Sequence, residues 1–203
     1  MNVYVFLHDT YADWELGYIL PELRCPPDYP EIKKNVKNIK TFSLSNDSIQ
    51  SMGGLNVIPD TKLESVNVDD ISCLILPGGL FWHGFENAEL ASLIKELRKK
   101  VIPIGAICAA TGYLGRIGLL DAVKHTSNSL EFLKYVAPDY QGSQYYQDEL
   151  VYSDDHIITA SGLGSIDFAR CLLDELDVYE PPVLEVWYQA FKNGIDPTKS
   201  GAT

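Results

Sequence analysis

The amino-acid sequence predicts an α/β fold in which helices cover both faces of a mainly parallel, doubly wound sheet. Short apolar runs rich in β-branched residues alternate along the chain with segments of helical periodicity, as expected of βαβ units. With 203 residues, 46% of them apolar, the chain can bury a core between two helical layers. Neither a repeat nor a low-complexity segment divides the sequence, so we expect a single domain over residues 1–203.

The strands are predicted from their apolar runs and the turn residues that bound them. The expected strands cover residues 3–7, 40–44, 73–76, 101–105, 150–153 and 157–160. A small β-hairpin is expected between Ile49 and Pro59, because Ser51-Met52-Gly53-Gly54 stands between two stretches of alternating residues.

The helices are predicted from apolar residues that recur every three or four positions. The expected helices cover residues 12–23, 90–101, 109–116, 129–136, 165–176 and 184–191. Pro21 is expected to kink the first helix or cut it short. The last helix is amphipathic, so it is expected to cover the core or a partner subunit.

The charge balance excludes several partners. The chain carries 28 acidic and 16 basic side chains, a net charge of -12, which repels nucleic acid and anionic membrane surfaces. The N-terminus lacks the basic region and cleavage site of a signal peptide, and no stretch is apolar enough to span a bilayer. We therefore expect a cytoplasmic protein without nucleic-acid or membrane partners.

The four cysteines are scattered and show no metal-binding spacing, so neither a structural metal nor a cofactor is predicted. Cys73 and Cys171 lie within apolar runs, where a cysteine is usually an inert small hydrophobe. Cys25 precedes two prolines and has no activating neighbour. Cys108 differs, because it joins a predicted strand to a predicted helix with almost no loop between them.

The turn at Cys108 is typical of a nucleophile. Small neighbours such as Gly105 and Ala109 let the backbone turn sharply, and the turn presents the side chain at the carboxyl ends of the strands. The helix that follows directs its free N–H groups at the sulfur, which is expected to lower the pKa of the thiol. From this pattern alone, an inert buried cysteine is an equally good interpretation.

Five further motifs occur with this turn in a familiar order: Asp13-Trp14-Glu15, Leu76-Pro77-Gly78-Gly79, Gly118-Leu119-Leu120-Asp121, Lys124-His125-Thr126-Ser127-Asn128 and Ile158-Thr159-Ala160-Ser161-Gly162. Together with the turn around Cys108, they make the chain resemble the ThiJ/PfpI superfamily, also described as class I glutamine amidotransferase-like. The resemblance implies a three-layer flavodoxin-like sandwich. Members of the ThiJ/PfpI superfamily include the parkinsonism-associated deglycase, bacterial general stress proteins and proteins described as intracellular proteases.

The resemblance assigns roles around Cys108. A carboxylic acid from the first helix, here Glu15, would hydrogen-bond the reactive sulfur, although an acidic residue in a first helical turn also simply complements the helix dipole. The backbone N–H groups of Gly79 and Ala109 would hold an oxyanion, and Gly78 would line the pocket. A plain tight turn at the two glycines is the alternative.

A proton-transfer residue and a pocket mouth complete the implied site. By family position His125 would be the base, with His8 as a rival at the same sheet edge. Trp82 and His83 would line the mouth of the pocket. Protease-like members carry a histidine directly after the nucleophile where this chain has Ala109, so peptidase activity is not expected. The late His-x-Glu pair of true glutamine amidotransferases is also absent from the sequence.

Three functions follow as hypotheses. The first is a cysteine-dependent hydrolase or lyase acting on small carbonyl compounds or their adducts. The second is a stress-response redox sensor or chaperone-like protein in which Cys108 is oxidised without turnover. The third is a binding module with an inert cysteine. The resemblance further implies a homodimer.

Overall fold

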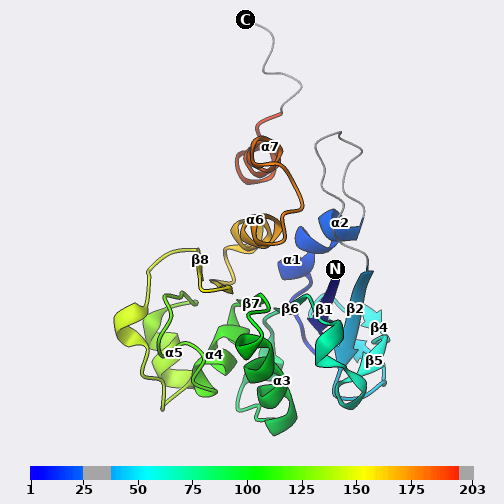
Figure 1. Cartoon of the computed structure of the whole chain (residues 1–203), viewed down its shortest axis with the longest axis vertical. Coiled ribbons are helices and arrows are strands. Elements are labelled where there is room, and N and C mark those ends of the chain that lie inside the picture. Colours follow the sequence, from blue (N-terminus) through cyan, green and yellow to red (C-terminus); the bar gives the residue numbers. More distant parts are fainter. Residues whose placement is uncertain (25–37, 197–203) are drawn as a thin grey trace, which may run out of the picture.

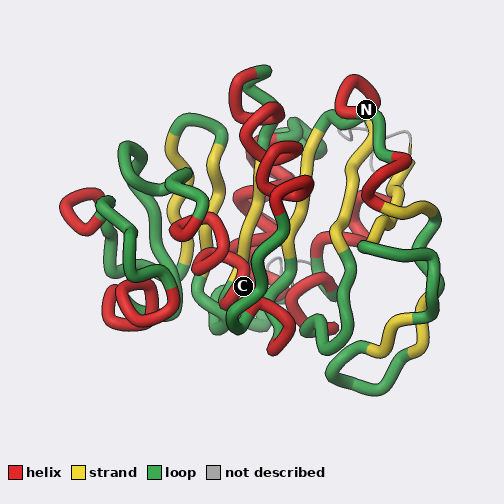
Figure 2. Tube along the Cα trace, turned by 90° about the horizontal axis from the view of Figure 1, so that it is seen from below, coloured by secondary structure: helices red, strands yellow, loops and turns green. Residues whose placement is uncertain are grey.

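A seven-stranded sheet forms the centre of the protein, in the strand order β5-β2-β1-β6-β7-β9-β8. The computed structural model describes residues 1–24 and 38–196. The strands are β1 (Asn2–Phe6), β2 (Asn38–Ser43), β5 (Thr61–Lys62), β6 (Cys73–Leu76), β7 (Ile104–Ile107), β8 (Val151–Asp154) and β9 (Ile157–Ala160). Neighbouring strands run parallel except for the pair β8–β9 at one edge. Figure 2 shows the strands of the sheet side by side in yellow. The predicted α/β class with a mainly parallel sheet is confirmed.

Helices cover both faces of this sheet (Figure 1). On one face lie α3 (Ala88–Lys99), α4 (Ala109–Arg116) and α5 (Leu130–Val136), and on the other α1 (Asp13–Leu16), α2 (Ile19–Arg24), α6 (Ser165–Glu175) and α7 (Pro181–Asn193). Short 3-10 turns are η1 (Leu63–Ser65), η2 (Val68–Asp70), η3 (Leu80–Trp82) and η4 (Ser143–Tyr145). Each helical layer shares a buried apolar cluster with the sheet, which gives the three-layer sandwich. No helix within the described ranges is both long and apolar enough to cross a membrane.

The predicted hairpin is present as a separate antiparallel pair, β3 (Ile49–Gln50) and β4 (Asn56–Val57). Its turn is bonded to the start of α1. The N–H of Gly53 donates to Asp13 Oδ2 at 2.6 Å, and the N–H of Met52 donates to the carbonyl of Tyr11 at 2.9 Å. The hairpin therefore braces the segment that carries Glu15.

The interruption expected from Pro21 is present, whereas one predicted boundary was wrong. The helix expected over 12–23 is two helices with a break at residues 17 and 18, because Pro21 has no N–H to donate to the carbonyl of Gly17, four residues earlier. The strand expected over 101–105 begins only at Ile104. Residues 101 and 102 instead close the C-terminal end of α3, since the N–H of Ile102 donates to Leu97 O at 3.0 Å and Val101 has a φ of 59°.

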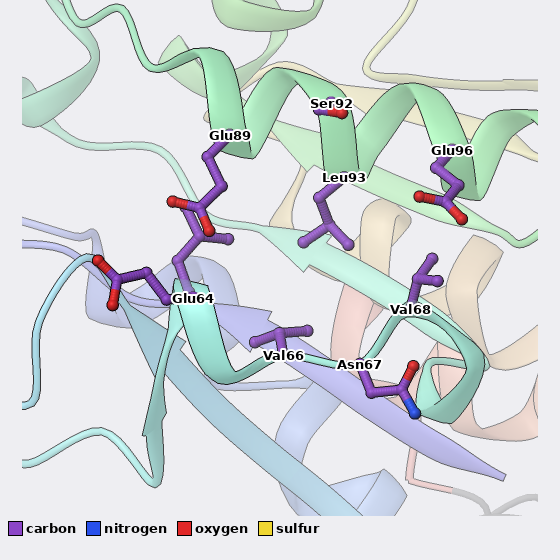
Figure 3. A pocket seen from close by; sticks show the side chains of 9 residues that line it. Glu64, Val66, Asn67, Val68, Glu89, Ser92, Leu93 and Glu96 are labelled. Atoms are coloured by element: carbon purple, nitrogen blue, oxygen red, sulfur yellow. The ribbon is translucent and has the colours of Figure 1, made fainter.

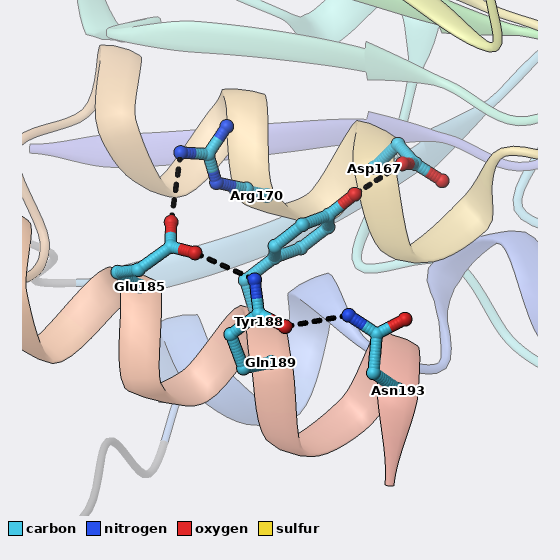
Figure 4. A network of polar contacts seen from close by, with 6 residues as sticks. All are labelled: Asp167, Arg170, Glu185, Tyr188, Gln189 and Asn193. Carbon is cyan, nitrogen blue, oxygen red and sulfur yellow. Dashed lines mark hydrogen bonds and ion pairs between the residues drawn. The ribbon is translucent and has the colours of Figure 1, made fainter. Parts of the chain in front are cut away.

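Polar contacts attach the last helix, α7, to α6 (Figure 4). Tyr188 donates to Asp167 Oδ1 at 2.8 Å, and Lys192 Nζ lies 2.6 Å from Asp167 Oδ2. Leu184 and Trp187 point into the core on the same side. The amphipathic pattern of α7 is thus explained within one chain.

The homodimer stays a prediction. Val186 and Phe191 on α7 and Ile195 just after it are each about half exposed, which leaves an apolar surface available to a second subunit. Light scattering at micromolar concentration is expected to give about twice the mass of one chain. A monomer under these conditions would contradict the prediction.

Candidate active site

Cys108 lies at the turn between β7 and α4. Its backbone has a φ of 58° and a ψ of -126°, a region that residues other than glycine rarely occupy. The N–H of Cys108 donates to Ala160 O at 2.9 Å, which continues the pairing of β7 with β9 to the last residue before the helix. The thiol is partly exposed, at the carboxyl edge of the sheet, where open α/β sheets bind ligands.

Glu15 and Gly78 converge on this thiol. The Glu15 side chain is only 1% exposed, and its Oε2 accepts a hydrogen bond from the N–H of Gly78 at 2.5 Å. The pKa of each of the two groups responds to the other, so the carboxyl group lies beside the thiol. A Cβ on Gly78 would lie 2.6 Å from Cys108 Cβ and 2.8 Å from Glu15 Oε2, so only glycine leaves room for these groups to meet.

Burial changes the acidity of both groups. It raises the pKa of Glu15 from 4.5 to about 7, against the lowering effect of the Gly78 N–H. Burial also raises the pKa of Cys108, and the negative charge of Glu15 adds to this, while donors on Asn128 and Ala109 oppose it. The prediction that the helix would lower the pKa of the thiol was therefore wrong, because burial and a neighbouring carboxylate outweigh the helix N–H groups.

Asn128 and Gly162, for which no role was predicted, also lie at the thiol. Asn128 Nδ2 lies 3.4 Å from Cys108 Sγ, and its Oδ1 accepts from the N–H of Gly162 at 2.9 Å. A Cβ on Gly162 would lie 3.0 Å from the sulfur. The position of Gly162 in the chain could have indicated its place. Gly162 follows β9, the parallel neighbour of β7, so it lies at the same sheet edge as Cys108.

Two backbone N–H groups are candidates for oxyanion donors. The N–H of Ala109, the first residue of α4, is directed at the thiol closely enough to lower its pKa. Gly79 directly follows Gly78 and has a φ of 147°. Tyr11 forms an antiparallel bridge with Gly79, which fixes the turn in place. These positions are compatible with the two oxyanion donors predicted, which remain a prediction.

The structure does not bring His125 to the thiol. Its ring is fully buried, with Nδ1 2.7 Å from Val123 O and Nε2 2.5 Å from the hydroxyl of Tyr140. Burial lowers its pKa. Both ring nitrogens already have partners, and within the described residues no hydrogen bond joins His125 to Cys108. His125 is therefore a core residue. The side chain that does reach the sulfur is that of Asn128, three positions later in the chain.

Two other aromatic candidates, Trp82 and His8, pack against the turn that carries Gly78 and Gly79. Trp82 is buried, and its indole N–H donates to Pro77 O at 2.8 Å, so it does not line an open mouth. His8 is also buried, stacked on Phe81, with Nε2 3.3 Å from the same carbonyl. Burial lowers the pKa of His8. His83 alone is exposed.

The remaining thiols are less suited to reaction than Cys108. Cys73 is fully buried, which raises its pKa strongly, and burial raises the pKa of Cys171 to about 11. Cys25 lies outside the described residues. No three His, Cys, Asp or Glu side chains of residues 1–24 and 38–196 come together as a metal-binding group.

A separate groove with room for about 300 Å³ lies between α3 and the segment from η1 to η2 (Figure 3). Glu64, Glu89 and Glu96 stand around an apolar floor that includes Val66 and Leu93. None of the residues around Cys108 lines this groove, so the chemistry at the thiol does not involve it.

The chain is similar to known proteins over most of its length. Residues 1–175 match the DJ-1/PfpI family. YoaZ of Bacillus subtilis, described as an uncharacterized protease, is 33% identical over 191 residues, which cover 94% of this chain and 90% of YoaZ.

Solved structures agree over nearly the whole chain. A ThiJ/PfpI family protein from Bacillus anthracis is 33% identical, with a TM-score of 0.87 over 96% of this chain and 92% of that one. A DJ-1 superfamily protein from Agrobacterium tumefaciens is 31% identical, with a TM-score of 0.83 over 96% of this chain and 98% of that one.

Proposed function

Because the chain belongs to the DJ-1/PfpI family, we propose that it is a cysteine-dependent hydrolase or lyase for small carbonyl compounds or their adducts, with Cys108 as nucleophile. The observation that carries the proposal is a partly exposed thiol, held on a strained turn, beside the buried carboxyl group of Glu15. A nucleophile next to a group that can take its proton is the arrangement that covalent catalysis needs.

The first step moves one proton and forms one bond. The Glu15 carboxylate takes the proton of the Cys108 thiol, and the thiolate attacks the carbonyl carbon of the substrate. As the C–S bond forms, the π electrons of the carbonyl move to oxygen, where the N–H groups of Gly79 and Ala109 would donate hydrogen bonds. With a pKa of about 7, Glu15 is suited both to accept and to return a proton near neutral pH.

The proton on Glu15 then has two possible destinations. On an aldehyde or ketone it goes to the oxyanion and gives a thiohemiacetal. On an amide or ester it goes to the leaving nitrogen or oxygen, and water hydrolyses the thioester that remains. His125 has no part in this scheme, because Val123 and Tyr140 already occupy its ring nitrogens.

The test is turnover of a panel that contains methylglyoxal, small amides, esters and a peptide. Cys108→Ala is expected to lower turnover of the accepted class at least about 100-fold, because the nucleophile is lost. Cys171→Ala is the matched control, since it removes another partly exposed thiol outside the site. The peptide is expected to be a poor substrate, because Ala109 stands where protease-like members carry a histidine. Equal turnover by wild type and Cys108→Ala would contradict the proposal.

The second candidate function is oxidation without turnover. It is favoured by the exposure of Cys108, to which peroxide could transfer one oxygen, giving a sulfenic acid and water. If the wild type turned over no member of the panel while mild peroxide added oxygen at Cys108 alone, this function would replace the first.

A further inference from the structure

We propose that Asn128 is a further catalytic residue, whose side-chain amide, held in one orientation by Gly162, donates the hydrogen bond that stabilises the Cys108 thiolate. This inference rests on the proposed role of Cys108 as the nucleophile. It assigns the position beside the sulfur to an uncharged donor and not to a base.

The orientation of the Asn128 amide follows from its partners. A side-chain amide has one acceptor oxygen and one donor nitrogen. The backbone N–H of Gly162 can only donate, so it requires the oxygen, which lies 2.9 Å away. The NH₂ group is thereby turned toward Cys108 Sγ, at 3.4 Å. A thiolate is an acceptor and gains from this arrangement, whereas the opposite orientation would set two acceptors against each other.

The segment that carries Asn128 is anchored on both sides of the thiol. The N–H of Thr126 donates to Thr159 Oγ1 at 2.8 Å, which attaches the segment to β9. The hydroxyls of Ser127 and Thr111 are 2.6 Å apart, and Thr111 also donates to the carbonyl of Cys108 at 2.6 Å. The amide is therefore placed by β9, the neighbour of β7 in the sheet, and by α4, which begins at the turn, as a preorganised donor requires.

An amide at this position divides the work of the site. It neither accepts nor releases a proton near neutral pH, so its hydrogen bond is available at every pH at which the protein is folded. Proton transfer is left to Glu15, the titratable side chain whose charge acts on the pKa of the thiol. Asn128 thus favours the thiolate while Glu15 receives the proton.

The experiment measures alkylation of Cys108 by iodoacetamide between pH 6 and 10, with the modified peptide quantified by mass spectrometry. Asn128→Leu keeps the approximate size of the side chain and removes the donor. Asn128→Asp also replaces the donor by a negative charge. At pH 7 we expect Asn128→Leu to react several-fold more slowly than wild type and Asn128→Asp about tenfold or more, with the midpoint of the profile moved to higher pH in both.

Asn67→Asp is the matched control. Asn67 is exposed, and its side-chain oxygen accepts from the N–H of Asp69, a role that aspartate keeps. It is expected to leave the profile unchanged.

Two results would overturn the inference: profiles of both variants that coincide with wild type, or rates lowered equally at every pH without a moved midpoint, as a purely structural role predicts. Failure of the proposed function is a separate result, because it is read from turnover by Cys108→Ala and not from alkylation.

Discussion

Glu15→Gln is expected to be more stable than wild type at pH 8 and, at the same time, less active. Burial raises the pKa of Glu15 from 4.5 to about 7, so the folded protein must ionise a buried carboxyl group at pH 8. A difference of this size corresponds to about 3 kcal/mol. Glutamine has nearly the same shape, stays neutral and can still accept the hydrogen bond from Gly78, so the variant avoids this cost.

The pH dependence has a definite sign. Between pH 4.5 and 7 the unfolded chain has lost the proton of Glu15 while the folded chain still holds it, so the contribution of Glu15 to stability decreases as pH rises through this window. Glu15→Gln should lack that decrease. Urea unfolding at pH 5, 6, 7 and 8 measures it, and the two proteins should converge toward pH 5.

Turnover by Glu15→Gln should decrease, although its stability at pH 8 increases. Glutamine cannot take the proton of the Cys108 thiol, so turnover is expected to fall at least about tenfold at pH 7. Glu131→Gln is the control, since Glu131 is exposed in the first turn of α5. A Glu15→Gln variant that is less stable than wild type at pH 8 would refute the role of the buried proton.

Gly79→Ala is expected to lower the free energy of unfolding by several kcal/mol relative to wild type. The φ of 147° is unfavourable for any residue with a Cβ, and this Cβ would lie 2.3 Å from Thr10 O and 2.7 Å from His8 Cε1. Because the first of these atoms belongs to the backbone, relief requires the turn itself to move. The variant should also lose turnover, since the turn carries one of the two proposed oxyanion donors.

Gly54→Ala separates the two causes. Gly54 also has a positive φ, 85°, but a Cβ there would meet no heavy atom within 4 Å. It should lose only about 1 kcal/mol through backbone strain. Urea unfolding of the two variants at one pH gives the comparison, and equal losses would mean that the contact with Thr10 is unimportant.

The fold could be predicted largely because the central strands of the sheet are short, mainly apolar runs. The runs at 73–76 and 157–160 coincide with β6 and β9, which have no exposed residue. The error at β7 arose because the apolar run from Val101 to Ile107 is longer than the strand, and its first residues close α3 instead. The two residues of β5 are too few to show a pattern.

The site was predictable where local chain geometry determines it. Cys108 and Glu15 each follow from the turn or helix that carries them, together with the resemblance. Asn128 and Gly162 meet the sulfur only through the pairing of β7 with β9, which residue spacing does not encode. His125 was predicted as the base from its family position and from the chemistry of an imidazole. The packing of its ring against Tyr140 decides its position, and packing is not visible in a sequence.

The backbone of Cys108 has a consequence for evolution at this position. A φ of 58° with a ψ of -126° costs a residue with a side chain about 1–3 kcal/mol, and glycine would adopt it with little strain. Selection for stability alone would thus replace the cysteine by glycine. The backbone conformation at Cys108 therefore lowers the stability of the folded chain, and the proposed chemistry of the thiol would explain why a cysteine is kept there.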